Sequence, residues 1–522
     1  MTRLRFMLLM LISGTLLLLT AQVPAQAQEK QDTAIGKVAD LIGDALRAAV
    51  GQRKAVRAEA VVDAPAMVAV EAAEQPPRAA SEVEQRLQRL NAWSAAMQSW
   101  IGHAGTLSDE QLQQLQQLAT AEIKSSQQKW AKPNPRSANE PLLDTFPIKF
   151  TVRSGTAEQL DLARRPQKLK SILTEDQLTA LQDAEQERRA FQFEAMVGYV
   201  LNLLDDELYL TAKQRQDMRE PLAGELRGKE NTSFSMFAQS YYYPQSSITF
   251  LLQEGDHLQF LNDAQKNRAS DFSNIGRNGG SNNSEQYIMF ESSEGTDGWY
   301  RKLKESAETQ RARIQRACEV RVAYYQQICR LPDDRANHLR VAGKGVTDQL
   351  IRDWKKTTSR QLKNYEQQVG LFNGNFSFSM QVANQSQIDS HDLWKHTLES
   401  LSPEVADFVV ARETVRRDAT ARFLTALLDR ELWLLPEQRP QVQQLVQQSL
   451  PAKNNINPYR NYMDEVAMLI VPLFKFSKQD ATVFQGPQQA AWETLKKEFE
   501  FNGRYVLVHM KNGGQFHFPV PQ

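Results

Sequence analysis

The stretch LLDDELYL at residues 203–210 recurs 224 positions later as LLDRELWL at residues 427–434. Between 203–226 and 427–450, nine of 24 positions are identical without a gap. Upstream, the spacing from Thr174 to Arg188-Arg189 equals the spacing from Ser402 to Arg416-Arg417, so joining the two matches needs a four-residue deletion, about one helical turn. A unit of about 100 residues is therefore predicted to occur twice, roughly at 170–270 and 395–495.

Apolar residues recur at spacings of three and four along most of the chain, beginning at Val83. Residues 301–330 and 346–369 carry two long stripes, which predict an antiparallel helical hairpin of the coiled-coil kind with a link of about 15 residues. Residues 375–382 and 504–510 alternate weakly, as strands do. The predicted fold class is mainly α: a duplicated multi-helix unit around an inserted hairpin, with few or minor β-strands.

These patterns divide the chain into seven predicted segments. They are a signal peptide (1–27), an N-terminal helix and Ala-rich linker (28–82), an N-terminal helical segment (83–165), the first copy of the helical unit (166–270), a mobile Ser-, Asn- and Gly-rich loop plus the hairpin insert (271–394), the second copy (395–502) and a C-terminal tail (503–522).

The first 27 residues have the three regions of a secretory signal peptide. Arg3 and Arg5 precede an apolar run over residues 6–19, and Ala25-Gln26-Ala27 gives the small-x-small cleavage pattern. The run is short for a spanning helix, which needs roughly 18 residues, so cleavage is expected and an uncleaved anchor is the alternative. No later segment is expected to span a membrane, and the protein is expected to be periplasmic or secreted.

Charge and composition exclude several classes of protein. The chain has 62 Lys+Arg and 62 Asp+Glu, and removal of residues 1–27 leaves a net charge of −2. A nucleic-acid binder would show a concentrated basic excess, so no nucleic-acid partner is expected. Two cysteines are too few for a disulfide scaffold or a zinc site built from cysteines.

A short pattern, Leu-Ser/Thr-x-x-Gln, begins at Leu107, Leu173 and Leu210, with looser versions at Leu401 and Leu434. The hydroxyl can accept a hydrogen bond from an N–H of the first helical turn, and the Gln side chain can reach back to the N–H of the cap residue. The pattern predicts five helix starts.

The chain resembles large, uncharacterised secreted proteins of planctomycete bacteria. The resemblance is carried by the Leu-Thr-x-x-Gln starts, the Leu-Asp-x-x-Leu-x-Leu-x-x-x-Gln-Arg unit and the segment CRLP…HLRVAGKG at residues 329–345, and it covers about 170–500. The capping pattern is also similar to that of the periplasmic LTxxQ (Spy-type) stress proteins, which are small helical chaperones. The first resemblance implies no established activity.

No catalytic, cofactor-binding or metal site is predicted, and no cofactor is expected. None of the seven histidines has metal-ligand spacing, and Gly343-Lys344-Gly345 is interpreted as a break between helices. Asp205/Glu207 and Asp429/Glu431 are interpreted as partners of the recurring arginines. Cys318 and Cys329 are expected to be free thiols on one helix. The best candidate for a partner-contacting surface is Tyr241, Tyr242 and Tyr243, although core packing is an alternative.

Two functions are compatible with these patterns. The first is an exported, non-enzymatic helical protein, which acts as an envelope scaffold, a partner-binding module or a holdase-like module, with a protein partner or self-association. The alternative is a secreted hydrolase whose active site is assembled between the two helical units.

Overall fold

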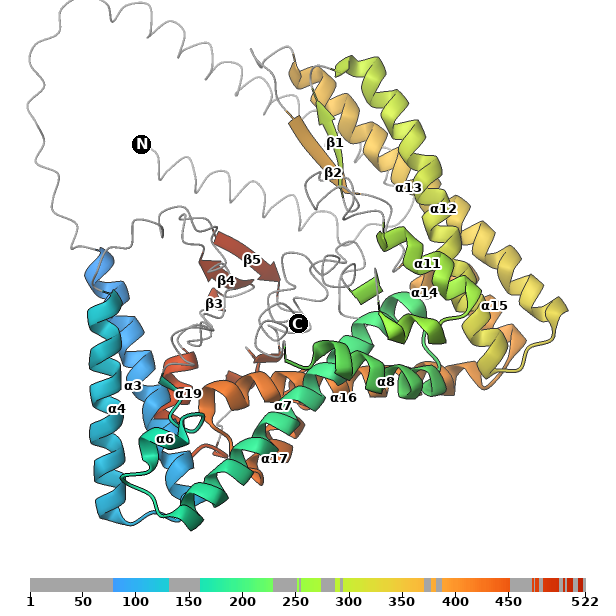
Figure 1. Ribbon diagram of the computed structural model, residues 1–522. Helices are drawn as coiled ribbons and strands as arrows, with labels where there is room; N and C mark the ends of the chain where they lie inside the picture. Colours follow the sequence, from blue (N-terminus) through green and yellow to red (C-terminus); the bar gives the residue numbers. More distant parts are fainter. Residues whose placement is uncertain are drawn as a thin grey trace, which may run out of the picture. The chain divides into compact units, whose positions relative to one another are not determined.

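The structure, a computed structural model, describes residues 78–130, 160–228, 251–252, 255–273, 287–291, 294–369, 377–381, 387–450, 472–473, 475–477, 482–496, 501–502, 505–509 and 515–519. The described part is mainly α-helical, as predicted (Figure 1). The labelled helices are α3 (Arg78–Gly105), α4 (Asp109–Trp130), α6 (Pro166–Leu169), α7 (Glu175–Leu208), α8 (Ala212–Leu226), the 3-10 helix η2 (Asp256–Phe260), α11 (Asp263–Ser273), α12 (Gly295–Ile328), α13 (Asp333–Val369), α14 (Gln387–Ser390), α15 (Asp392–Leu401), α16 (Val405–Leu432), α17 (Gln438–Ser449) and α19 (Pro487–Lys496).

In the described part of the chain, five short strands form two antiparallel sheets. They are β1 (Tyr287–Glu291) paired with β2 (Ser377–Gln381), and β3 (Phe501–Asn502), β4 (Tyr505–His509) and β5 (Gln515–Pro519) in that order. Strands β2 and β4 fall in the two weakly alternating segments. The prediction of a Ser-, Asn- and Gly-rich loop before the hairpin, which composition places over residues 270–294, is wrong at both ends, because α11 continues to Ser273 and β1 begins at Tyr287. Strand β1 pairs with β2, which lies 90 positions later along the chain. Local composition does not predict a strand that depends on so distant a partner.

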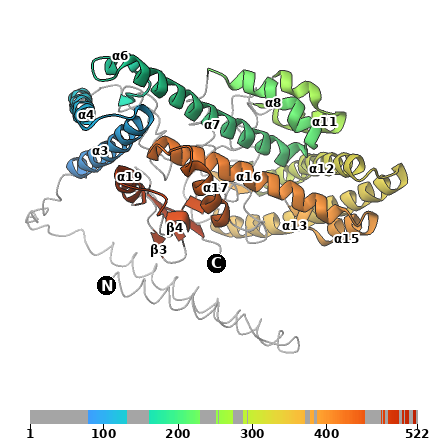
Figure 2. The same cartoon turned by 90° about the horizontal axis from the view of Figure 1, so that it is seen from below.

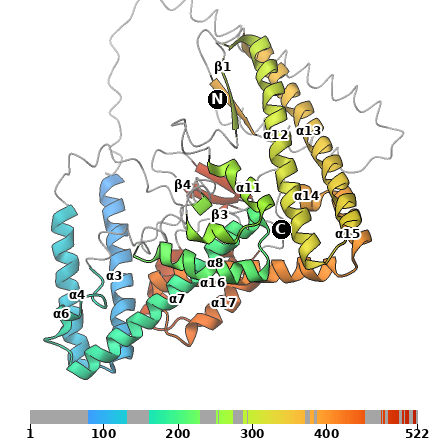
Figure 3. The same ribbon diagram turned by 45° about the vertical axis from the view of Figure 1, so that its right-hand side comes forward.

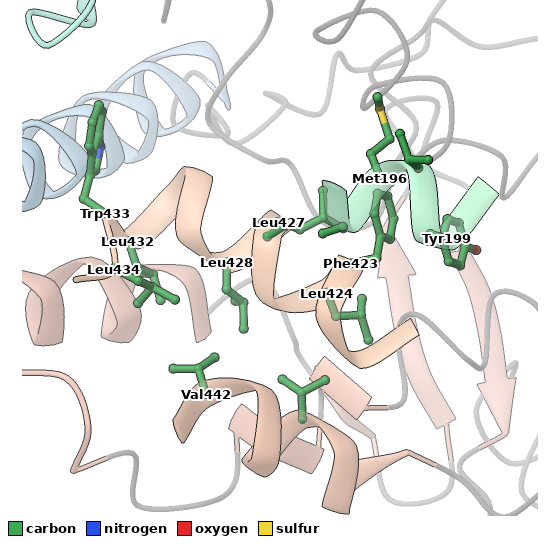
Figure 4. Close-up of a cluster of buried hydrophobic side chains, with 14 of the residues drawn as sticks. Met196, Tyr199, Phe423, Leu424, Leu427, Leu428, Leu432, Trp433, Leu434 and Val442 are labelled. Carbon is green, nitrogen blue, oxygen red and sulfur yellow. The ribbon is translucent and has the colours of Figure 1, made fainter. Parts of the chain in front are cut away.

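Helices α7 and α16 pack against each other and organise the largest core cluster (Figure 2). Near the middle of the pair, Tyr199 of α7 stacks on Phe423 of α16, with ring centroids 4.3 Å apart and an interplanar angle of 4°. These two residues are themselves 224 positions apart. In Figure 4, Phe423 lies beside Met196 and Tyr199, and Leu428 of α16 faces the helix that carries Val442. Contact between equivalent positions is the property of a two-fold interface.

Two helical hairpins flank this pair, α3–α4 and α12–α13 (Figure 3). Their turns have the same backbone geometry. Thr106 and Arg330 both adopt the left-handed conformation (φ of 52° and 50°), and the next residue, Leu107 or Leu331, donates its N–H to the carbonyl oxygen five residues earlier. This is the Schellman pattern of a helix end.

The predicted link of about 15 residues in the second hairpin is wrong, because α13 begins at Asp333 and only residues 329–332 join the helices. The predicted helix break at Gly343-Lys344-Gly345 is wrong as well, since both glycines lie inside α13. A Cβ on Gly343 would lie 3.1 Å from the Cβ of Cys318 and 3.4 Å from the ring of Trp394. This glycine therefore permits close packing between helices rather than a turn.

The described residues fall into a first half (78–273) and a second half (287–496) that repeat one another. Within the described part of the chain, four non-glycine residues have positive φ, and they form two pairs 224 positions apart: Thr106 with Arg330, and Tyr209 with Trp433. The predicted boundaries of the copies stay a prediction. The structural correspondence extends beyond them, because the α12–α13 hairpin occupies in the second half the place that α3–α4 has in the first.

None of the described helices combines the length and the apolar character that a membrane crossing requires.

Candidate functional site

The ends of α7 and α16 are unusual, because a large aromatic residue occupies the left-handed position that normally favours glycine. Tyr209 has φ 52° and ψ 63°, and Trp433 has φ 55° and ψ 59°. Each donates its N–H to the carbonyl oxygen of the aspartate four residues earlier, Asp205 or Asp429. A left-handed backbone conformation costs a residue with a side chain roughly 1–2 kcal/mol. The contacts of the aromatic ring must therefore stabilise the fold by more than that amount.

The Trp433 ring gains its contacts from an arginine of the other half. The guanidinium of Arg188, on α7, lies 3.8 Å from the centroid of the Trp433 ring. The same group donates from Nη2 to the carbonyl oxygen of Asp429 (2.8 Å), and its Nε lies 3.1 Å from Oδ2 of that carboxylate. Gln192 donates to the same Oδ2 (2.6 Å). We call Arg188, Asp429 and Trp433 the Arg188 centre.

The second half repeats this arrangement with the helices exchanged. Arg412, on α16, donates from Nη2 to the carbonyl oxygen of Asp205 (2.7 Å) and from Nε to its Oδ2 (2.9 Å). Its guanidinium lies 3.8 Å from the centroid of the Tyr209 ring. We call Arg412, Asp205 and Tyr209 the Arg412 centre. In each centre an arginine of one long helix therefore binds the carboxyl end of the other.

A further carboxylate approaches each centre from the segment that precedes the long helix. In the first half it is Asp161, 6% exposed, whose carboxylate lies 3.1 Å from Nε of Arg164. Burial, reinforced by the charge of Glu185, raises the pKa of Asp161 to about 6, although Arg188 and Arg164 oppose the shift. Burial also opposes ionisation of Glu185, but Arg188 and neighbouring arginines outweigh it and lower its pKa.

In the second half the corresponding carboxylate is Asp389, which follows the sequence Gln-Ile as Asp161 follows Gln-Leu. Arg321 of α12 holds Asp389 with two hydrogen bonds, of 3.0 Å and 2.9 Å, and the Tyr209 hydroxyl donates to the same carboxylate. Burial, partly offset by Arg321, raises the pKa of Tyr209 well above its usual value, so the hydroxyl remains a donor.

The two hairpins cover the two centres with different side chains. Trp93 and Trp100 of α3 lie against the Trp433 ring, at centroid distances of 5.6 Å and 5.4 Å. On the other side, Tyr324 of α12 meets the Tyr209 ring edge-on at 5.6 Å. Trp100 and Tyr324 are again 224 positions apart, so the covers are equivalent in position and differ in chemistry.

The Leu-Ser/Thr-x-x-Gln pattern forms the predicted caps at its three strict occurrences. The looser versions differ, because α16 begins at Val405 with Ser402 accepting only from the N–H of Glu404 (3.3 Å), and α17 begins at Gln438 itself. Sequence reasoning missed the second role of these glutamines. Their side-chain amides join helix starts in hydrogen-bonded pairs: Gln111 with Gln177, Gln214 with Gln265, and Gln438 with Gln488.

The recurring arginines form ion pairs, but the predicted alignment between the copies is wrong. Arg188 was matched to Arg416 through a deletion placed after the arginines, whereas its structural counterpart is Arg412, at the ungapped distance of 224. The missing turn lies before Arg412, near the start of α16, which has 28 residues against the 34 of α7. Applied to the arginines, the ungapped distance would have identified Arg412 from the sequence.

Other predicted residues do not gather at the two centres. Tyr241, Tyr242 and Tyr243 lie outside the described residues, as do residues 1–77. Cys318 and Cys329 are both free thiols, and burial raises the pKa of Cys318 to about 11. Among the described residues, no three His, Cys, Asp or Glu side chains are grouped so that they could hold a metal ion.

Chemically, the two centres join helices. Arg188 is 2% exposed and Asp429 is completely buried, and a buried charge is tolerated only when it is paired and hydrogen-bonded. Each aspartate faces an arginine of the opposite long helix and an arginine of the helix that follows its own, Arg215 or Arg439. The arrangement neutralises the carboxylates and gives them no exposed substrate-facing side.

Comparison with known proteins gives no further assignment: no protein family, no curated protein and no solved structure matches this chain.

Proposed function

We propose that this chain is an exported, non-catalytic helical protein that acts as a partner-binding scaffold of the cell envelope. The observation that supports this proposal is that the charged side chains repeated in both halves are used to join helices. Arg188 and Arg412 each bind the carboxyl end of the opposite long helix, so the repeated residues have a structural use. A catalytic use would be expected to differ between the halves.

The surface of α16 supports the partner-binding part of the proposal. Within the described residues, five large apolar side chains are exposed, and three of them lie in the first half of this helix: Val409, Val410 and Val415. The positions equivalent to Val409 and Val410 in α7 are Glu185, which is buried in ion pairs, and Gln186, which is exposed. At 100° per residue these three valines point in different directions around α16, so they are separate apolar contacts rather than one continuous patch. Exposed apolar side chains on one half alone suit a specific protein partner or self-association, whereas a holdase needs a broad apolar surface.

Export is the second part of the proposal, supported by the basic, apolar and small-residue regions at 1–27. Expression with its own leader in a Gram-negative host, followed by fractionation and N-terminal sequencing, should give a periplasmic chain that begins at Gln28. A cytoplasmic chain that keeps Met1 would contradict export.

The absence of catalysis is tested on the chain from Gln28 on, with polysaccharide, peptide and ester substrates. We expect no turnover above that of the Asp389→Asn variant, which removes the more exposed of the two carboxylates that approach the centres, Asp161 and Asp389. Turnover that Asp389→Asn abolishes at a temperature where circular dichroism shows the variant to be folded would contradict the proposal and favour the hydrolase.

The partner surface is tested by light scattering and by cross-linking in envelope extracts. Val410→Asp should reduce self-association or cross-linking, because it replaces the most exposed of the three valines with a charge. Gln186→Asp is the matched control, since it changes the equivalent exposed position of α7. Equal effects of the two variants would contradict a role for the α16 surface.

A further inference from the structure

The outer face of α13 carries a row of cations in its last third. Arg352, Lys356, Arg360 and Lys363 are spaced by four, four and three residues, and Lys355 lies beside them; all five are exposed. At 100° per residue, the four spaced cations lie within roughly 80° of one another, and at 1.5 Å per residue they span roughly 16 Å. The row is therefore a single line of positive charge along one helix.

The helix that carries the row is firmly held on its opposite side. Ile351, Thr358 and Leu362 are buried, with exposed fractions of 2%, 2% and 0%. Leu362 belongs to a small core with Phe290 of β1 and Trp299 of α12. The cations are thus presented on a fixed backbone, which keeps their spacing constant.

These five cations differ from the arginines of the two centres, because no ion pair or hydrogen bond joins their side chains to a described residue. By contrast, Arg188, Arg321 and Arg412 each bind a carboxylate. Residues 352–366 contain five cations and two acids, Asp353 and Glu366, and so carry a net charge of +3 in a chain whose total is zero. The positive charge is therefore concentrated locally, and no side chain in the described part of the chain neutralises it.

The geometry of the row selects among anionic partners. Within described residues 342–366, no large apolar side chain is exposed, whereas proteins that insert into lipid or stack on nucleotide bases present exposed aromatic or aliphatic side chains. The four spaced cations follow one another at intervals of about 4.5–6 Å along the helix axis, and this spacing matches a polymer with one anionic group on each sugar unit. The match is to a linear chain rather than to a surface.

We propose that the row formed by Arg352, Lys355, Lys356, Arg360 and Lys363 binds a linear acidic polysaccharide through its carboxylates. This inference rests on the proposed scaffold function, to which it adds a polysaccharide at α13 beside the protein partner proposed at α16. Each contact replaces counterions of the polymer, so binding weakens steeply with salt.

The test measures binding of the chain from Gln28 on to immobilised alginate, a linear polyuronate, at low and at moderate salt, with neutral dextran as the reference. The quadruple variant Arg352→Gln, Lys356→Gln, Arg360→Gln and Lys363→Gln should bind at least about tenfold more weakly and lose most of the salt dependence. The matched control removes four exposed cations from other elements, Lys124, Lys170, Lys266 and Lys395, each changed to Gln, and should stay within about twofold of the parent chain.

Equal losses in the two quadruple variants would overturn the proposal, because overall charge would then explain binding. So would absent binding at low salt, or stronger binding to anionic phospholipid vesicles or to single-stranded DNA than to alginate. Circular dichroism of both variants confirms that each is folded. Cleavage of alginate would contradict the proposed non-catalytic function, whereas failure of binding without cleavage would overturn only this inference.

Discussion

The Arg188 centre and the Arg412 centre have the same bonds and different surroundings. In both, the guanidinium lies 3.8 Å from an aromatic ring and binds both the carbonyl oxygen and the carboxylate of one aspartate. Tryptophans cover the first centre, and a tyrosine and Arg321 cover the second. The comparison shows that the left-handed helix end and the arginine–aspartate contact are common to both centres. The polarity of the side chains that α3 and α12 pack against them differs.

The largest expected effect comes from removing the bridging arginine. Arg188→Met should lower the free energy of unfolding by about 3–5 kcal/mol, because Asp429 is completely buried and would lose its closest cation. Arg412→Met should cost less, about 2–3 kcal/mol. Without Arg412, Asp205 keeps the N–H of Leu210 (2.7 Å) and Arg215 (3.4 Å). Without Arg188, by contrast, Asp429 keeps the amide of Gln192 (2.6 Å) and the more distant Arg439 (3.8 Å). Urea unfolding of both variants measures the comparison.

A double variant provides the control for that comparison. Combining Arg188→Met with Asp429→Leu removes both charges and should recover part of the lost stability, because the completely buried Asp429 carboxylate is then no longer left without its arginine. If Arg412→Met costs as much as Arg188→Met, the two centres are energetically equal, and the difference in their surroundings has no consequence for stability.

The second expected effect depends on pH and belongs to the first half. The folded pKa of Asp161 is about 6, above its ordinary 3.8, so the folded state binds the proton more tightly. The resulting penalty is absent below pH 4, grows as the pH rises to 6, and is complete above it, on the order of 3 kcal/mol. Asp161→Asn should remove this dependence, which amounts to about 1.5 kcal/mol between pH 5 and pH 7.5.

Chemical denaturation at the two pH values checks this sign. Asp389→Asn is the comparison, because Asp389 accepts two hydrogen bonds from Arg321 and its loss should destabilise the chain at both pH values. A parent chain that is more stable at pH 7.5 than its Asp161→Asn variant would show that the carboxylate is stabilising there, against the expectation.

The sequence alone supported the helical class, the strict caps and the recurrence of the LLDxELxL stretch, because each depends on local spacing. It did not show that α12–α13 is the counterpart of α3–α4, since the common feature is a backbone turn. Thr106 and Arg330 share a left-handed conformation without sharing a side chain. Asp161 and Asp389 were missed for a related reason, because each meets its arginine only after distant segments pack together.

The smallest expected effect concerns the glutamine pairs, which make similar hydrogen bonds but differ in burial. Gln438 is 8% exposed and hydrogen-bonds to the N–H of Leu435, the carbonyl oxygen of Val483 and the amide of Gln488. Gln111 makes the equivalent contacts but is only half-buried. Gln438→Ala should therefore cost about 1–2 kcal/mol, and Gln111→Ala about half as much, because water can reach the groups left behind.

Thermal unfolding of the two variants measures this difference, and a double variant separates its causes. If unsatisfied partners cause the loss, Gln438→Met combined with Gln488→Met should be closer to the parent chain than Gln438→Ala is, because the pair is then replaced by apolar side chains of similar length. Equal costs for Gln438→Ala and Gln111→Ala would mean that burial does not decide the strength of these joints. In that case the capping hydrogen bond, which both glutamines make, would account for the whole effect.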